Sequence, residues 1–135
     1  LGARKGGSPT VCSDGIRSIL PAMRRARVQR LIALSAYGAA ETRNDSWFIR
    51  LVRKLISEKM RDKDDMEALV RASPAEWTLV RPPALTNGAA SGGYRSGIGL
   101  KPGVTGRVSR ADLAAFMLNV AESSDYLRQA PVVSL

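Results

Sequence analysis

The chain contains no histidine and a single cysteine, Cys12, among its 135 residues. Without an imidazole, every catalytic triad that uses a histidine base is excluded. A lone thiol without histidine also leaves no donor set for a zinc site with nitrogen and sulfur ligands, so we predict no metal site. One cysteine cannot form an internal disulfide, which suits a reducing compartment, and we therefore expect a cytoplasmic protein. Any proton transfer must use Ser, Tyr, Lys, Asp or Glu side chains, or water.

Long apolar runs and aromatic side chains are scarce as well. No apolar run is long enough to span a bilayer and no signal-peptide pattern stands at the start, so we expect no membrane partner. The net charge of +9 would suit a polyanion, but aromatic residues make up only 5% and do not alternate with basic ones. Some cations end an expected helix, where they stabilise its dipole: Arg24, Arg25 and Arg27. The pattern therefore disfavours nucleic acid as a partner.

The remaining composition is that of an ordinary globular domain. Hydrophobic residues account for 44% and charged residues for 24%. A chain of this length forms one domain and buries roughly two-thirds of its unfolded surface. We therefore expect a single domain over residues 1–135.

The stretch 76–88 is the centre of the chain's organisation. Trp77, Thr78, Leu79 and Val80 carry no charge and favour a short strand buried on both faces. The following segment, 81–83 (Arg-Pro-Pro), stops the strand, because proline cannot donate to a ladder. In a parallel α/β sheet, ligands bind beyond the carboxyl ends of the strands, so we look for a ligand at this loop.

Apolar periodicity predicts the other elements. Stripes at helical spacing predict helices over 12–26, from 48 to 56, over 61–72, and from Ser109 to about 122. We expect Ser109 to cap the last of these helices. The apolar run 31–34 is typical of a central parallel strand, and it ends in Ser-Ala-Tyr-Gly (35–38). Segment 92–106 is rich in glycine and is expected to form a mobile flap with short extended pieces, and 131–133 is expected to form a final edge strand.

Three loops follow predicted strands directly and should emerge at one edge of the sheet. They are segments 2–4, 35–38 and 81–85. Together they offer backbone amides, two hydroxyls, a guanidinium and rigid prolines. That combination is a suitable wall for a planar, partly apolar ring.

Several segments, in order, resemble the atypical short-chain dehydrogenases/reductases. Segment 77–86 (Trp-Thr-Leu-Val-Arg-Pro-Pro-Ala-Leu-Thr) is similar to the strand and loop that face the nicotinamide in the NAD(P)H-binding, biliverdin reductase B/flavin reductase-like group, a neighbour of the NmrA-like proteins. Segments 1–4 and 28–35 look like that family's fourth and fifth strands. Segment 63–67 resembles its Lys-x-x-x-Glu helix, and 109–114 (Ser-Arg-Ala-Asp-Leu-Ala) its late Ser-Arg-x-Asp-Leu-Ala motif.

The resemblance implies an α/β fold, the C-terminal part of a Rossmann-like doubly wound parallel sheet. The family's first strands and glycine-rich loop have no counterpart in this sequence, so we expect a partial domain and a C-terminal fragment. The implied function is NAD(P)H-dependent reduction of a small conjugated acceptor such as a flavin or quinone, with NADP or NAD as cofactor. The alternative is a non-catalytic, NmrA-like module that senses the dinucleotide and binds a partner.

The resemblance also assigns site residues. The candidate catalytic residues are Ser35, Tyr37 and Lys63. The candidate cofactor contacts are Gly2, Ala3, Arg4, Ser35, Ala36, Pro82, Pro83, Ala84 and Leu85.

Three assignments at this site have alternatives. Without the resemblance, Ser35 is interpreted as a residue that forms the turn after its strand. The classical superfamily pairs Tyr-x-x-x-Lys, but Lys59 stands where the tyrosine of that pair with Lys63 would be. Lys63 alternatively pairs with Glu67 on the helix surface. Arg81 either pairs with a carboxylate such as Asp112 or orients a ligand.

Overall fold

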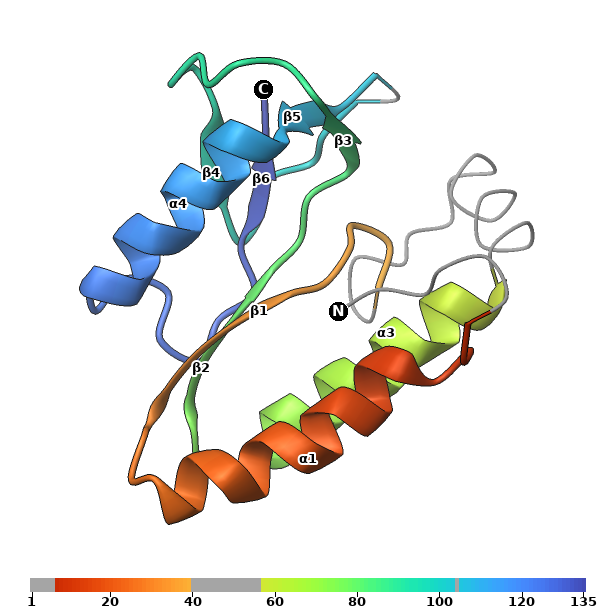
Figure 1. Ribbon diagram of the computed structural model, residues 1–135. Coiled ribbons are helices and arrows are strands. Elements are labelled where there is room, and N and C mark those ends of the chain that lie inside the picture. Colours follow the sequence, from red (N-terminus) through yellow and green to blue (C-terminus); the bar gives the residue numbers. More distant parts are fainter. Residues whose placement is uncertain (1–6, 40–56, 104) are drawn as a thin grey trace. The chain divides into compact units, whose positions relative to one another are not determined.

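The computed structural model describes residues 7–39, 57–103 and 105–135 (Figure 1). These fall into two compact units, which we describe separately. The helical unit comprises Leu1–Arg30 and Gly38–Ala75, and the sheet unit comprises Leu31–Tyr37 and Glu76–Leu135. The predicted helix from 48 to 56 and the predicted cofactor segment 2–4 lie outside the described residues.

Two helices lying side by side make up the described part of the helical unit (Figure 1). They are α1, Val11–Arg25, and α3, Ser57–Ala72. Ile16 of α1 and Met66 and Val70 of α3 are buried, as their helical spacing predicts. The first prediction is within one residue at each end, whereas α3 begins at Ser57 rather than at residue 61.

The sheet unit begins with two neighbouring strands, β1 (Arg30–Leu34) and β2 (Glu76–Val80). In β2 the last four residues are buried, which confirms the predicted buried strand. Every residue of β1, in contrast, is only half-buried. Among the described strands, the neighbour of β1 is β2.

The C-terminal strand lies inside the sheet unit, where we had predicted an edge strand. β6 (Val132–Ser134) is fully buried and pairs antiparallel with β4 (Arg95–Gly97). On its other side the chain bonds to Arg81, the residue directly after β2, through Arg81 N to Pro131 O at 2.9 Å and Val133 N to Arg81 O at 3.4 Å. The edge prediction was wrong because the supposed flap supplies β4, a partner that local sequence does not reveal.

A third strand pair and a helix complete the sheet unit. β3 (Ala84–Thr86) runs parallel to β5 (Arg107–Ser109), and α4 (Arg110–Glu122) follows β5 directly. The predicted cap is confirmed, because the Ser109 hydroxyl accepts a hydrogen bond from Asp112 N at 2.9 Å. α4 contributes Leu113, Phe116 and Val120 to a hydrophobic core. The other buried residues of this core are Val80, Val108 and Val133.

None of the helices among the described residues has the length and apolar character needed to cross a membrane.

Candidate functional site

The loops that follow β1 and β2 lie next to each other, as predicted for the carboxyl edge of a parallel pair. Ser35 N donates to Val80 O at 2.8 Å, and Tyr37 N donates to Pro82 O at 2.9 Å. Partner numbers rise together along the two segments, so the segments run parallel beyond the strands. This pairing brings Ser35, Ala36 and Tyr37 alongside the proline loop.

The Ser35 side chain is the most informative group at this edge. The residue is 4% exposed, and its Oγ makes no hydrogen bond to any part of the chain that the structure describes. A buried hydroxyl without a partner costs free energy, so most buried hydroxyls in native proteins are bonded. An unsatisfied hydroxyl at a strand's carboxyl end is suited to bind a polar ligand atom.

The proline loop is held rigidly in place. Pro82 is buried and Pro83 half-buried, and the loop continues into β3, where Ala84 and Leu85 pair with β5. Gly106 lies so close that a Cβ on it would stand 3.4 Å from Pro83 Cγ. A loop fixed in this way presents its carbonyl groups and apolar ring atoms with little ordering cost on binding.

Arg81 and Asp112 are both buried in the sheet unit, but they do not form the pair that we considered from the sequence. The Asp112 carboxylate instead accepts hydrogen bonds from Ser91 N, Gly92 N and the hydroxyls of Ser91 and Ser109, at 2.8–3.1 Å. The bond from Gly92 N–H is the main reason that the pKa of Asp112 lies below its usual value, against the opposing effect of burial.

Asp112 therefore joins the start of α4 to the loop at 91–92. The Ser-x-x-Asp spacing indicated its bond to Ser109 but not the one to this loop, which is distant in sequence. We call these residues, Ser91, Gly92, Ser109 and Asp112, the Asp112 clamp.

Lys63, the third candidate catalytic residue, lies on α3 in the helical unit, next to Cys12. Burial raises the pKa of the Cys12 thiol, and the positive charge of Lys63 offsets this only in part. The alternative partner of Lys63, Glu67, has its carboxylate 3.8 Å from Arg71 Nε. The role of Lys63 in binding a ligand stays a prediction.

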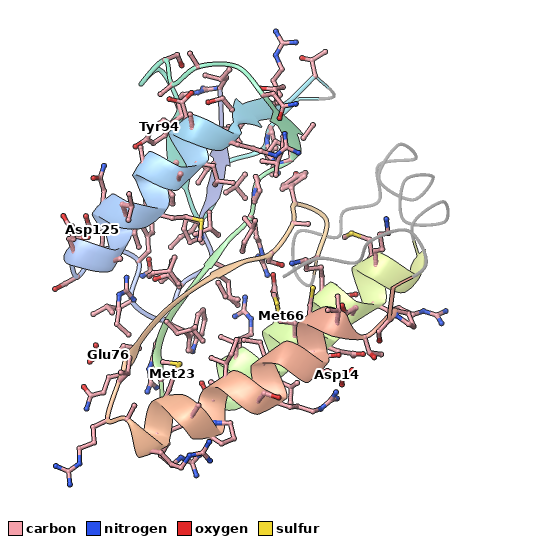
Figure 2. The ribbon with its side chains drawn as sticks, in the orientation of Figure 1. Asp14, Met23, Met66, Glu76, Tyr94 and Asp125 are labelled. Carbon is pink, nitrogen blue, oxygen red and sulfur yellow. The ribbon has the colours of Figure 1, made fainter. Side chains whose placement is uncertain are left out.

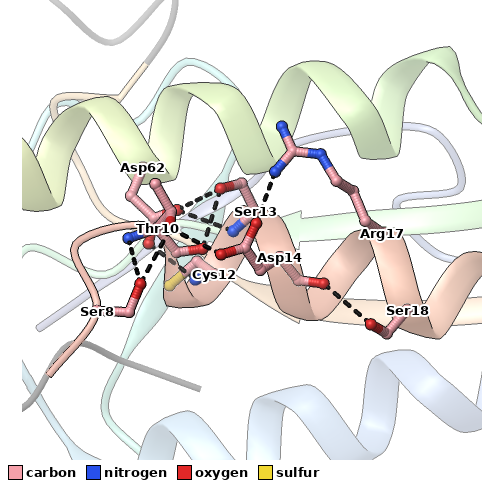
Figure 3. A network of polar contacts seen from close by, with 8 residues as sticks. All are labelled: Ser8, Thr10, Cys12, Ser13, Asp14, Arg17, Ser18 and Asp62. Atoms are coloured by element: carbon pink, nitrogen blue, oxygen red, sulfur yellow. Dashed lines mark hydrogen bonds and ion pairs between the residues drawn. The ribbon is translucent and has the colours of Figure 1, made fainter.

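The adjacent Asp62 joins the two helices of this unit, as Figure 3 shows. Its carboxylate accepts hydrogen bonds from Cys12 N, Ser13 N and the Ser13 hydroxyl, each at 2.8 Å. Burial would raise the pKa of Asp62, but together these bonds lower it below its usual value. Asp62, on α3, thus accepts hydrogen bonds from backbone N–H groups at the amino end of α1 that have no acceptor within their own helix.

The structure brings some of the predicted site residues together and leaves others apart. Ser35, Ala36 and Tyr37 lie with Pro82, Pro83, Ala84 and Leu85 at one edge of the sheet unit. Lys63 belongs to the helical unit, and Gly2, Ala3 and Arg4 lie outside the described residues.

Comparison with known proteins identifies the type of ligand. A sequence model of NAD(P)H-binding proteins matches residues 2–124. The chain belongs to the NAD(P)H-binding family. Membership confirms the cofactor class predicted from the sequence, a nicotinamide dinucleotide, NADP or NAD. A search of curated proteins finds no match.

Solved structures show the fold of this NAD(P)H-binding chain. ChuY from Escherichia coli O157:H7, described as an anaerobillin reductase, superposes with a TM-score of 0.80 at 19% identity, over 98% of this chain and 60% of its own. A short-chain dehydrogenase/reductase from Veillonella parvula in complex with NADP gives 0.78 at 16% identity, over 91% of this chain and 58% of its own. A Rossmann-fold NAD(P)-binding protein from Shigella flexneri superposes with a TM-score of 0.68 at 19% identity, over 98% of this chain and 56% of its own.

These superpositions confirm the α/β, Rossmann-like fold class. The chain spans about 60% of the length of the ChuY structure that it matches. The buried, unsatisfied Ser35 hydroxyl and the rigid proline loop fit a nicotinamide dinucleotide, which carries both polar amide atoms and a flat ring.

Proposed function

We propose that the protein acts as an NAD(P)H-dependent oxidoreductase that reduces a small conjugated acceptor such as a flavin or quinone. The observation that carries the proposal is the buried Ser35 hydroxyl without a partner, beside the proline loop of an NAD(P)H-binding chain. The cofactor, when bound, supplies a hydride to the acceptor, and a proton completes the reduction.

In this proposal the chain's own residues hold the reactants and supply hydrogen bonds. The Ser35 hydroxyl bonds a polar atom of the bound ligand. The half-exposed Tyr37 offers a second hydroxyl for the proton. Ala36, Pro82, Pro83, Ala84 and Leu85 form the wall against the ring. Lys63 contacts the ribose or a carboxylate, and Gly2, Ala3 and Arg4 border the cofactor.

The Ser35→Ala variant tests the central assignment through two effects of opposite sign. Removing an unsatisfied buried hydroxyl should raise the free energy of unfolding of the ligand-free chain by about 1 kcal/mol. The same change should weaken NADPH or NADH binding about fivefold, since one hydrogen bond to the ligand is lost. Urea unfolding and titration by nicotinamide fluorescence measure the two quantities.

Ser18→Ala, an exposed serine on α1, is the matched control and should change neither quantity. Unchanged dinucleotide affinity in Ser35→Ala would remove this serine from the site. Steady-state oxidation of NADPH and NADH with menadione or FMN then tests catalysis. Dinucleotide binding without turnover would favour the alternative, a non-catalytic sensing module.

A further inference from the structure

A hollow lies in the sheet unit, beside the loop at 125–129. It has a volume of about 480 Å³ and is lined by Tyr94, Ser96, Phe116, Asn119, Val120, Asp125, Tyr126 and Gln129. This loop bonds to β2 through Arg128 N to Trp77 O at 2.7 Å and Leu79 N to Gln129 O at 3.0 Å. None of the described residues that line the hollow belongs to the edge that holds Ser35 and Pro82.

Three aromatic rings form the apolar part of this hollow. The ring of Phe116 lies between those of Tyr94 and Tyr126, with centroids 5.9 Å away on both sides. Tyr94 and Asp125, labelled in Figure 2, both lie beside α4. Pockets of roughly 300–1,000 Å³ with aromatic walls are the usual size and character of small-molecule sites.

Polar groups at the hollow can orient a ligand. Ser96 Oγ and Tyr126 OH are 3.1 Å apart, so one hydroxyl donates to the other and the second hydroxyl hydrogen remains available. The exposed amides of Asn119 and Gln129 offer both donors and acceptors. A bound molecule with a polar edge can therefore be held in one orientation.

The charge at the hollow is opposite to that of the whole chain. Of the described residues that line it, only Asp125 is charged, although the chain carries a net charge of +9. Among the described lining residues there is no Lys or Arg to bind a phosphate group. This separates the hollow in chemistry from a dinucleotide site.

The backbone beside the hollow is strained. Tyr126 and Arg128 have φ angles of 55° and 53°, the left-handed region that side chains rarely adopt. Bonds to β2 hold this conformation, including Thr78 Oγ1 to Tyr126 O at 2.8 Å. Such outliers persist only where the surroundings fix them, and they gather at functional sites.

We propose that this hollow is a second binding site, for a flat, uncharged aromatic molecule with a hydrogen-bonding edge. It does not depend on the proposed reductase function. The aromatic walls contact the ring, and the Ser96–Tyr126 hydroxyls bond its polar edge.

Lumiflavin is a suitable probe, because it is flat and uncharged and has a polar edge. FMN carries the same ring with a phosphate and should bind this hollow about tenfold more weakly or worse, since no basic side chain among the described lining residues binds the phosphate. Titrations of the full chain by flavin fluorescence give the affinities. Amide shifts in ¹H–¹⁵N spectra should move at 94–97 and 125–129.

Asn119→Trp fills the hollow from the surface of α4 and should reduce lumiflavin affinity about tenfold or more. Leu118→Trp is the matched control, because Leu118 is the neighbouring residue, is 64% exposed and does not line the hollow. This variant should bind lumiflavin with the affinity of the unmodified chain. Tyr126→Phe keeps the ring but removes the hydroxyl, and should weaken binding several-fold.

Three results would overturn the proposal. One is lumiflavin binding that Asn119→Trp leaves unchanged, which would place the flavin elsewhere, as at the Ser35 edge. Another is no saturable binding up to the solubility of the probe. The third is movement of the 125–129 amides with protein concentration alone, which would make the hollow a contact between copies.

Discussion

Asp62 is the residue that joins the two described helices of the helical unit. Replacing it with Ala would leave three donors at the start of α1 without an acceptor. We expect the free energy of unfolding at pH 7 to fall by about 1–3 kcal/mol. Asp65→Ala is the matched control, because this exposed carboxylate lies on the same helix outside the network. Urea unfolding of both variants measures the difference.

The pH dependence of this contribution follows from the direction of the shift. Folding lowers the pKa of Asp62 below its usual value of 3.8. Its stabilisation is therefore complete above the unfolded-state pKa, and it is lost as pH falls through the lower folded-state value. The difference between the unmodified chain and Asp62→Ala should be constant near neutral pH and should shrink in strong acid. A difference that grows in acid would contradict the assignment.

Asp112 has a comparable role at the residue scale, between α4 and the loop at 91–92. Asp112→Asn removes the negative charge that the amides of Ser91 and Gly92 bond. Charge-assisted hydrogen bonds are stronger than neutral ones, so these two amides should exchange with solvent several-fold faster. Hydrogen exchange followed by NMR measures this change.

Glu122→Gln, at the other end of α4, serves as the control for Asp112→Asn and should leave both amides unchanged. Equal protection of Ser91 and Gly92 in the unmodified chain and in Asp112→Asn would mean that the Asp112 clamp does not hold the loop.

At the scale of elements, the turn that leads directly into β5 depends on Gly106. A Cβ at this position would meet Pro102 Cβ at 2.5 Å and the Gly103 carbonyl oxygen at 3.0 Å. Gly106→Ala should therefore lower the free energy of unfolding by about 1–3 kcal/mol, the usual cost of overpacking. Thermal or urea unfolding measures the change.

Gly103→Ala is the matched control in the same turn, since nothing lies within 4 Å of a Cβ there. It should be neutral or stabilise by up to about 1 kcal/mol, because alanine reduces the freedom of the unfolded chain. Equal destabilisation by both substitutions would show that close approach at Gly106 is not the cause.

Elements with a local signal were predicted closely from the sequence. The apolar spacing of α1 and α4 and the Ser109 cap depend on residues within a few positions of one another. The uncharged residues of β2 and the prolines after it likewise predicted a buried strand and its end. Local patterns suffice for such elements because helix spacing and proline geometry are properties of the adjacent backbone.

At the scale of the whole molecule, the sequence by itself determined the α/β class, the cofactor class through the family resemblance, and the loops after β1 and β2 as site candidates. Only the tertiary structure decided that β6 lies between β2 and β4. It alone showed Ser35 buried without a partner, Asp62 and Asp112 joining distant segments, and a hollow beside Tyr126. The physical reason is that burial and hydrogen-bond satisfaction depend on neighbours far apart in the chain, which no local pattern specifies.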